Sequence, residues 1–369
     1  MNNSSLYKIG VAAFIVALVI AFLVLAKNIL VPLAFSFLLA YLLYPAVWKI
    51  ERNGVHRIVA ILIVIIIVLV FFAAVTFYFS IQLSNISIDL NGMKDRLLSD
   101  STSFKFMLED KFGVNLNTME YYMEKGVTAI VDALQSGSGN IFSATATSVF
   151  QIFILPVFTF FILFNRTKFA YFIFRLVGHQ YRQKAIHILK EVKHVATRYL
   201  GGIVLVVIIL AFLNSGGLAI IGVPHAIVLG VGAALLNLIP YFGTLIGALV
   251  PIFYVLISVD DPLSMVVKVI VMFIIVQFLE NNIITPYVVG GNVKLNPLTI
   301  IIGLLIGNLV WGVAGMLIIV PFLAILKIVM RNIDSLQPFA YLMSNKGLEK
   351  HRIHFAGFFK YIWNKIRRK

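Results

Sequence analysis

The stretch "IVAILIVIIIVLVFFAAVTFYF", residues 58–79, contains 22 residues and no charge. A helix needs about 20 apolar residues to cross the hydrocarbon core of a membrane. The rest of the chain has the same character: of its 369 residues 61% are hydrophobic and only 12% are charged, with a mean hydropathy of +0.99. Soluble domains carry about one quarter charged residues. The sequence therefore predicts an all-α integral membrane protein.

The polar loop before this stretch sets the predicted orientation. It reads "KIERNGVHR" (49–57) and carries Lys49, Arg52 and Arg57. Short loops rich in Lys and Arg stay on the cytoplasmic side, so we expect this loop and the N-terminus inside. Three spans are expected within residues 1–83, at about 8–27, 29–48 and 57–83. The first lacks a small-residue cleavage pattern and is expected to be retained.

The chain turns polar after the third span. Residues 84–146 contain eight acidic and five basic residues. Within them, Asn117 is followed three residues later by Glu120, which resembles the capping box that starts a helix. Apolar residues then follow at helical spacing. We expect 84–146 to be a small helical extramembrane insert on the outer face.

Basic residues concentrate in two further segments that we expect in the cytoplasm. Residues 147–198 hold a fourth span, at about 145–164, and then a segment (165–198) with eight Lys or Arg against Glu191 alone. Its apolar positions form one stripe, which predicts an amphipathic helix on the anionic leaflet or against the bundle. The tail, 331–369, carries nine Lys or Arg against two acids. The net charge of +15 is thus explained by membrane orientation, and no nucleic-acid partner is expected.

The ordinary pattern of spans fails within residues 199–330, the predicted transport core. A fifth span (199–222) and a later one (about 263–285) are regular, but the apolar runs 225–257 and 297–330 are each interrupted by Gly and Pro. More than thirty residues exceed one straight crossing and fit a re-entrant hairpin or two half-helices. The chain then has about eight hydrophobic segments, two of them broken.

The two broken runs resemble each other. Each follows or begins with a proline (Pro224, Pro297), has a glycine six residues later (Gly230, Gly303) and carries a late proline (Pro251, Pro321). If 225–257 crosses fully, the acidic loop 258–264 lies inside. If it is a hairpin that opens outward, 297–330 opens inward, and the two span-plus-hairpin units form an inverted repeat. We favour the inverted repeat, because the loop has no Lys or Arg.

Helix breaks at membrane depth survive only where they are buried in protein or line a wet cavity. In transporters such breaks build the substrate site. The alternative is that Gly and Pro serve close packing, because "GTLIG" (243–247) and "GLLIG" (303–307) are both Gly-xxx-Gly motifs. Two matched breaks favour the functional interpretation.

Two stretches carry a resemblance to a known family: "LLNLIPYFGTLIGALVP" (235–251) and "VQFLENNIITPYVVGGNVKLNPLTIIIGLLIGNLVWGVAGMLIIVPFLAILK" (276–327). Here the chain resembles the autoinducer-2 exporter family of bacterial membrane proteins. The resemblance implies a secondary exporter of the furanone autoinducer-2, a quorum-sensing signal, working by alternating access. Some members of that family are described as Na⁺/H⁺ antiporters, which is the alternative function. The resemblance also implies a homo-oligomer that lies as a multi-pass protein in the bacterial cell (inner or plasma) membrane. The basic loop 49–57 and the basic tail predict that both termini are cytoplasmic.

Glu280 is the strongest candidate for the mechanism, because it is an acid inside an apolar span and such residues are expensive to place there. A carboxylate at this depth could bind a small polar substrate or a coupling H⁺ or Na⁺; a position near the headgroups, where water would solvate it, is the alternative. Gln277 and Asn281 lie at helical spacing from it or from each other. The other residues of the predicted pathway are amides and helix-shaping residues at the breaks: Asn237, Pro240, Gly243, Gly247, Pro251, Pro286, Asn308 and Trp311.

Other classes of function find less support. The chain has no cysteine, which excludes thiol catalysis, disulfides and thiolate metal sites. Ser215 and His225 could suggest a serine–histidine pair, but no motif of a serine, metallo- or aspartyl hydrolase accompanies them. We expect no enzyme activity, cofactor or metal. A channel or an envelope scaffold stays open; the expected partners are a small-molecule substrate and membrane lipids.

Overall fold

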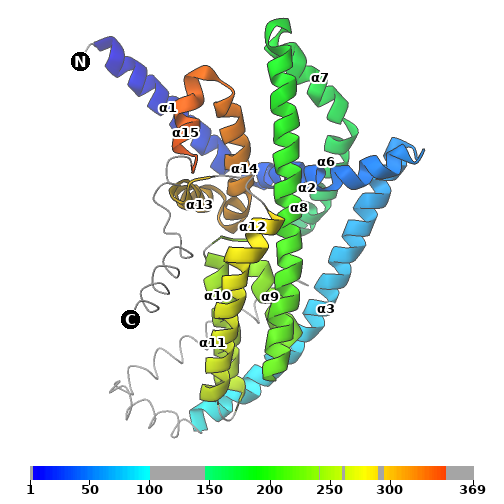
Figure 1. Ribbon diagram of the computed structural model, residues 1–369, viewed down its shortest axis with the longest axis vertical. Coiled ribbons are helices and arrows are strands. Elements are labelled where there is room, and N and C mark those ends of the chain that lie inside the picture. The colour runs from blue at the N-terminus through cyan, green and yellow to red at the C-terminus, as the bar shows by residue number, and fades with distance from the viewer. Residues whose placement is uncertain (1–2, 100–145, 241, 260–261, 290–294, 346–369) are drawn as a thin grey trace, which may run out of the picture. The chain divides into compact units, whose positions relative to one another are not determined.

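The computed structural model describes residues 3–99, 146–240, 242–259, 262–289 and 295–345 (Figure 1). Their regular structure is helical, and a single antiparallel bridge joins Leu295 to Ser344. In chain order the elements are α1 (Asn3–Leu25), α2 (Lys27–Arg52), α3 (Arg57–Ser99), α6 (Ala146–Phe164), α7 (Arg166–Val177), η1 (His179–Tyr181), α8 (Arg182–Ile221), α9 (Ala226–Leu236), α10 (Phe242–Ser258), α11 (Pro262–Leu279), η2 (Glu280–Ile284), α12 (Thr285–Val288), α13 (Pro297–Trp311), α14 (Val313–Arg331), η4 (Asp334–Leu336) and α15 (Gln337–Leu342).

The helices confirm the predicted class, an all-α membrane protein with several spans. Within the described ranges, five stretches are long and apolar enough to cross a membrane, judged by length and composition. A sixth is possible if α6 and α7, bent by 62° at their junction, form one broken span. The five are 27–52, 57–82, 179–221, 262–288 and 313–331.

Two predicted segments fall mainly outside the described residues. Of the predicted insert 84–146, residues 100–145 are not described, and residues 84–99 belong to the long helix α3. Of the predicted tail 331–369, residues 346–369 are not described. The outer-face insert and the cytoplasmic tail therefore stay predictions.

Helix α8 joins the basic segment to the fifth span without a break. Its 40 residues correspond to about 60 Å of helix, twice the roughly 30 Å of the hydrocarbon core. In and just after its basic half, the apolar residues Val192, Val195 and Tyr199 are buried, whereas Lys190 and His194 are exposed; Tyr181, which precedes the helix, is exposed as well. The predicted amphipathic pattern is present, but on a helix that continues through residue 198.

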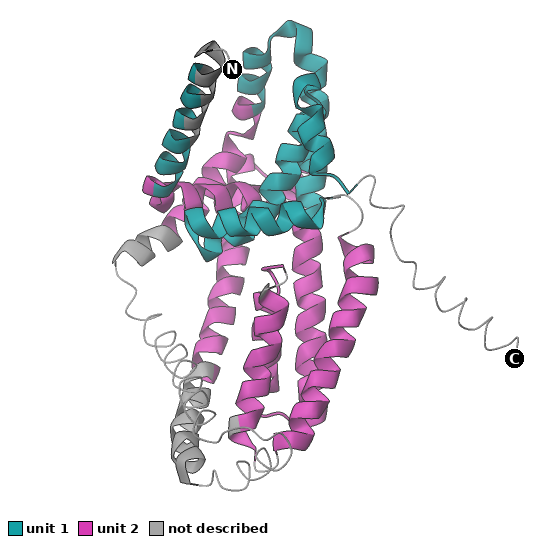
Figure 2. Cartoon of the chain, turned by 90° about the vertical axis from the view of Figure 1, so that its left-hand side faces the viewer, with its two compact units in different colours: residues 1–24, 170–199, 291–369 teal, residues 25–169, 200–290 magenta. Residues whose placement is uncertain are grey.

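The chain divides into two compact units, coloured separately in Figure 2. Unit 1 comprises residues 1–24, 170–199 and 291–369, and unit 2 comprises residues 25–169 and 200–290. In unit 1, α13 packs against α14 and α14 against α15, and Arg331 at the end of α14 pairs with Glu191. In unit 2, α2 packs against α3 and α6, and α10 packs against α9, α11 and α3.

Each broken run is a pair of packed helices. Hairpin 1 consists of α9 and α10, joined through residues 237–241, and hairpin 2 consists of α13 and α14, joined at Gly312. Gly312 has φ +62° and ψ −143°, a conformation that is essentially restricted to glycine. The predicted hairpins are therefore present as folded elements, and the direction in which each opens across the membrane stays a prediction.

Glycines let the two helices of each hairpin approach closely. A Cβ at Gly243 would overlap the carbonyl oxygen of Leu236, and a Cβ at Gly247 would lie 2.9 Å from the carbonyl oxygen of Ala233. In hairpin 2, Gly307 and Gly315 face each other, and a Cβ at Gly315 would overlap the Gly307 carbonyl. The glycines of these motifs therefore allow close packing, and this close packing is what brings the two helices of each hairpin together.

Apolar residues in unit 2 hold hairpin 1 against its neighbours. One buried cluster joins α8, α9, α10 and α11 and includes Leu218, Leu229, Val255 and Val269. A second buried cluster in unit 2 contains Val206, Leu210, Ala234 and Val276. Between membrane helices such side chains stabilise the bundle by van der Waals packing, because lipid tails are as apolar as the side chains themselves. These two clusters pack α8, α9, α10 and α11 together, and the polar site described below lies among these helices.

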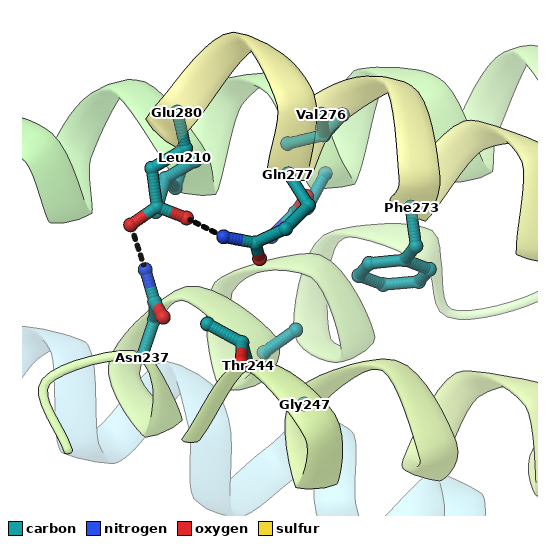
Figure 3. Close-up of a pocket in the computed structure, with 10 residues that line it drawn as sticks. Leu210, Asn237, Thr244, Gly247, Phe273, Val276, Gln277 and Glu280 are labelled. Carbon is teal, nitrogen blue, oxygen red and sulfur yellow. Dashed lines mark hydrogen bonds between the residues drawn. The ribbon is translucent and has the colours of Figure 1, made fainter. Parts of the chain in front are cut away.

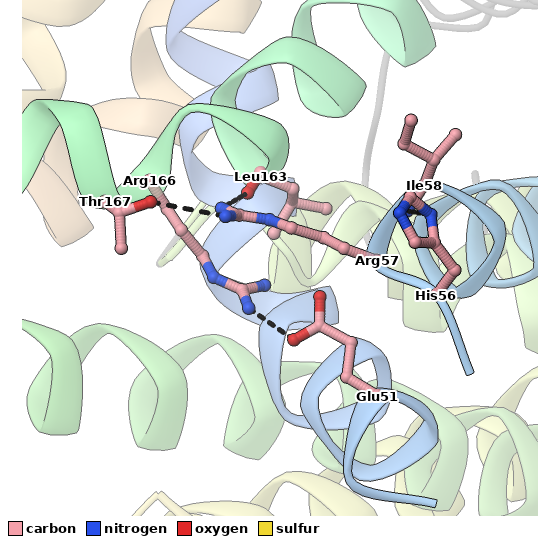
Figure 4. Close-up of polar contacts among 7 residues, drawn as sticks. All are labelled: Glu51, His56, Arg57, Ile58, Leu163, Arg166 and Thr167. Atoms are coloured by element: carbon pink, nitrogen blue, oxygen red, sulfur yellow. Dashed lines mark hydrogen bonds and ion pairs between the residues drawn. The ribbon is translucent and has the colours of Figure 1, made fainter. Parts of the chain in front are cut away.

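The basic loop 49–57, which we predict to be cytoplasmic, makes specific contacts with the chain around residue 165 (Figure 4). Arg57 donates to the carbonyl of Leu163 at 2.8 Å and to the Thr167 hydroxyl at 3.2 Å, so it satisfies a C-terminal carbonyl of α6. Arg166 pairs with Glu51, and its guanidinium lies 5.1 Å from the centre of the Tyr44 ring. A cation near a helix C-terminus is also favoured by the helix dipole. These contacts fix the junction of α2 and α3 against the junction of α6 and α7.

Candidate functional site

Three of the predicted polar residues meet in unit 2. Asn237 donates from Nδ2 to Oε1 of Glu280 at 2.7 Å, and Gln277 donates from Nε2 to Oε2 of Glu280 at 3.0 Å. Figure 3 shows the carboxylate held between the two amides, one from each side. Each oxygen of Glu280 thus accepts one hydrogen bond from a neutral donor.

The local backbone explains why these residues meet. Asn237 ends α9: its own N–H still bonds the carbonyl of Ala233 at 3.2 Å, while the following residues leave the helix. Gln277 and Glu280 lie three residues apart on the same helical face. Asn237 therefore presents its side chain from the break in hairpin 1, and the other two come from the end of α11 and the first residue of η2.

Helix α11 changes its winding at Glu280. Residues Glu280–Ile284 form a π-helical turn, in which the N–H of Thr285 bonds the carbonyl of Glu280. Pro286 follows; it has no N–H, and its ring would clash with the carbonyl four residues earlier in a regular α-helix. A wider turn relieves that clash. Such π-turns are frequent at functional sites.

A small cavity opens beside this cluster, and all its lining residues belong to unit 2. Its empty volume, open mouth included, is about 260 Å³, of which about 20 Å³ can be reached by the centre of a water-sized sphere. One water needs at least roughly 10–15 Å³ on that measure. In this conformation the cavity has room for about one water molecule or small ion. The lining residues are Leu210, Asn214, Ala233, Asn237, Thr244, Gly247, Phe273, Val276, Gln277 and Glu280.

The cavity has an unusual electrostatic character for an apolar bundle. Glu280 is only 9% exposed, and the described residues of the lining include no Lys, Arg or His. A buried charge is costly unless it is paired and hydrogen-bonded, and here only the two amides support it among the described lining residues. The carboxylate can therefore attract a proton, a cation or a hydroxyl donor, and it repels anions.

The remaining residues of the predicted pathway take other places. Asn281 is exposed and does not line the cavity. Pro286 starts the short helix α12, and Asn308 and Trp311 belong to hairpin 2 in unit 1. Trp311 donates from Nε1 to the carbonyl of Leu23 at 2.9 Å. Gly247 lines the cavity, while Pro240, Gly243 and Pro251 shape hairpin 1.

Several cavity residues were not among the predicted site residues. Thr244 sits one turn into α10, and Asn214 lies on α8 four residues after Leu210. Phe273, Val276, Gln277 and Glu280 follow the spacing i, i+3, i+4, i+7, which places them on one helical face. That spacing is a signal that could have found Phe273. Nothing in the sequence around Asn214 indicates which way its amide points.

The groups considered above for other chemistry have the following surroundings. No described group of three His, Asp or Glu side chains is placed to hold a metal. Ser215, considered above as a nucleophile, donates to the backbone carbonyl of Ile227 at 3.3 Å. His225 precedes α9 with φ +52°, and its ring packs edge-on against Tyr254 with centroids 6.0 Å apart.

Comparison with known proteins identifies one family. The family model described as AI-2E family transporter matches residues 13–335. Among the relatives is the AI-2 transport protein TqsA of Escherichia coli (strain K12), 24% identical over 331 residues that cover 88% of this chain and 92% of TqsA. YrrI and YueF of Bacillus subtilis (strain 168) are named as candidate transport proteins. They are 25% and 24% identical over 322 residues, covering 84% and 85% of this chain and 88% and 86% of theirs.

Proposed function

We propose that this chain, which belongs to the AI-2E transporter family, moves a small polar molecule of the autoinducer-2 type across the membrane by alternating access, with Glu280 at the centre of its binding site. The observation that carries the proposal is the carboxylate of Glu280, buried in an apolar bundle and held by Asn237 and Gln277. A polyol-like furanone offers hydroxyl groups that can donate to such a carboxylate. The name of TqsA, an AI-2 transport protein, supports this class of cargo.

The hydrogen bond between Asn237 and Glu280 suggests how binding is linked to movement. It joins the break of hairpin 1 to the π-turn η2. A substrate hydroxyl that bonds Glu280 competes with Asn237 for the same oxygen. A cavity with room for about one water cannot admit a furanone unless its walls move. Substrate entry therefore requires hairpin 1 or η2 to shift, and release of Asn237 makes that shift easier.

A second candidate, Na⁺/H⁺ antiport, is favoured by the size of the same cavity. Room for one water is also room for one small ion, and carboxylate, amide and hydroxyl oxygens are ligands suited to hard cations. Under this alternative Glu280 exchanges H⁺ for Na⁺. The two candidates share the site and differ in cargo.

Flux through purified protein in proteoliposomes tests both candidates. Labelled autoinducer-2 and Na⁺-driven proton movement are measured on the wild type, Glu280→Gln and, as a matched control one residue away, the exposed Asn281→Ala. Glu280→Gln removes charge-assisted hydrogen bonds worth about 1.5–3 kcal/mol each. We expect furanone flux to fall roughly 10-fold or more in that variant and to stay unchanged in Asn281→Ala.

The outcomes separate the candidates. Saturable furanone flux that requires Glu280 supports the exporter. Proton movement on adding Na⁺, without furanone flux, supports the antiporter. Full furanone flux in Glu280→Gln contradicts the role of the carboxylate, and flux that never saturates indicates a channel.

A further inference from the structure

One polar side chain of the cavity, that of Asn214, takes no part in the hydrogen bonds to Glu280 described above. Asn214 is 5% exposed, and its Oδ1 has no hydrogen-bond partner. It lines the same cavity as Glu280. The other two amides of the lining, Asn237 and Gln277, each donate one N–H to Glu280.

A buried amide oxygen without a partner is expensive, and proteins rarely leave one unsatisfied without a reason. Asn214 sits on α8, where Leu210 packs beneath it in an apolar cluster. An apolar residue of similar size would fill the same space without that cost. The oxygen is therefore placed for something that enters the cavity.

We propose that Asn214 is a ligand-binding residue of the transport cavity, and that the cavity selects a ligand that donates hydrogen bonds and is neutral or cationic, rejecting anions. Asn237 and Gln277 each donate one N–H to the carboxylate, whereas Oδ1 of Asn214 is an acceptor without a partner. None of the described lining residues is basic, so none of them can receive a negative charge. This inference deepens the proposed function and rests on it for the assignment of the cavity as the transport site.

The division of labour between the amides follows from their contacts. Asn237 and Gln277 hold Glu280, so their loss changes both the carboxylate and the ligand. The two oxygens of Glu280 accept from Asn237 and Gln277 and not from Asn214, so loss of the Asn214 amide removes a ligand contact and leaves the carboxylate held. Substitution at Asn214 therefore tests recognition separately from the Glu280 cluster.

The experiment uses a matched pair, Asn214→Thr and Asn214→Val, which have nearly the same shape and differ in a hydroxyl. Equilibrium binding is measured on purified full-length protein in detergent with three probes: the neutral furanone, its anionic borate ester and Na⁺. The wild type should bind the neutral furanone or Na⁺ and should bind the borate ester at least about tenfold more weakly. Asn214→Thr should keep binding, and Asn214→Val should lose up to about tenfold in affinity for the same probe, as expected for one hydrogen bond.

Three results would overturn the inference: equal affinities in the Thr and Val variants, tighter binding of the borate ester than of the neutral furanone, or no binding of either the furanone or Na⁺ by the wild type. If water alone serves Asn214, the Thr and Val variants bind equally. Because binding is measured without a membrane, the outcome is independent of transport. Binding with the expected pattern but without flux in proteoliposomes would uphold this inference and contradict the proposed function.

Discussion

The two hairpins share a pattern of Gly and Pro positions but make different polar contacts. Both have a buried glycine early in the first helix (Gly230, Gly303) and a buried proline in the second (Pro251, Pro321). Hairpin 1 turns through several residues, and its turn contains Asn237, which bonds Glu280. Hairpin 2 turns at Gly312 alone, and the residue before it, Trp311, bonds a backbone carbonyl of α1.

The difference indicates that the number of residues in a helix break determines which polar contacts the break can make. A break of several residues lets a side chain leave the helix axis and reach a neighbouring element. A break of one glycine reverses the chain but frees few polar groups from the helices. The polar contact beside it, from Trp311 to the carbonyl of Leu23, therefore serves to hold hairpin 2 against α1. We infer that hairpin 1 serves ligand binding and that hairpin 2 serves support, and three predictions test this contrast.

The largest effect is expected from Gly243→Leu in hairpin 1. Its side chain would overlap the carbonyl of Leu236 and force α9 and α10 apart, which costs about 3 kcal/mol or more by the upper range for overpacking. We expect transport to be lost while the protein still inserts in the membrane. Flux in proteoliposomes and thermal unfolding in detergent measure the two effects.

Gly232→Ala is the matched control in the same hairpin. A Cβ at Gly232 meets nothing within 4 Å, and alanine favours a helix interior by up to about 1 kcal/mol over glycine. This variant should transport normally and unfold at the same or a higher temperature. Normal flux in Gly243→Leu would contradict the packed break.

A smaller effect is expected from Gly312→Ala in hairpin 2. Its conformation, φ +62° and ψ −143°, should cost alanine about 1–3 kcal/mol. If hairpin 2 is support, this variant lowers the unfolding temperature and the amount of active protein, while KM for the substrate stays unchanged. Gly216→Ala, whose added Cβ meets nothing within 4 Å, is the control. A change in KM without a change in stability would place hairpin 2 in the binding site.

The smallest effect on activity is expected from Ser258→Cys and Ser335→Cys, which sharpen the comparison by locating the open ends of the hairpins. The chain has no natural cysteine, so each variant carries one thiol. The proposed inverted repeat predicts that a membrane-impermeant reagent labels Ser258→Cys from outside the cell and Ser335→Cys only from the cytoplasm, with transport unchanged in both. Labelling of Ser258→Cys from the cytoplasm alone would show that hairpin 1 does not open outward.

Much of the fold could be predicted because the hydrophobicity of a segment depends only on the residues of that segment. Apolar runs such as 58–79 become helices in lipid, where each backbone group must bond within its own segment. The pairs of Gly and Pro in 225–257 and 297–330 indicated helix breaks, and both runs fold as hairpins. The length of α8 was less predictable, because nothing in its local sequence separates a surface helix that ends at 198 from one that continues.

The site was predictable only in part. Glu280 stood out because a charge within an apolar run is costly wherever the helix lies. The neighbouring Asn281 has the spacing of a regular helix from Gln277, yet it is exposed. It lies seven residues after Ile274 and three after Phe278, which are both exposed, and so belongs to the outer face of the helix. Spacing from one residue shows that two side chains are neighbours, but not which side of the helix faces the cavity.

The sequence by itself determined the membrane class, the helical segments, the two breaks and the choice of Glu280 as the first candidate residue, because each of these depends on the free energy of local segments in lipid. The tertiary structure alone decided that Asn237 and Gln277 hold Glu280, that Asn214 and Thr244 share its cavity, and that Asn308 and Trp311 belong elsewhere. Those outcomes depend on how helices rotate and approach one another, which is set by side-chain packing between segments far apart in the chain.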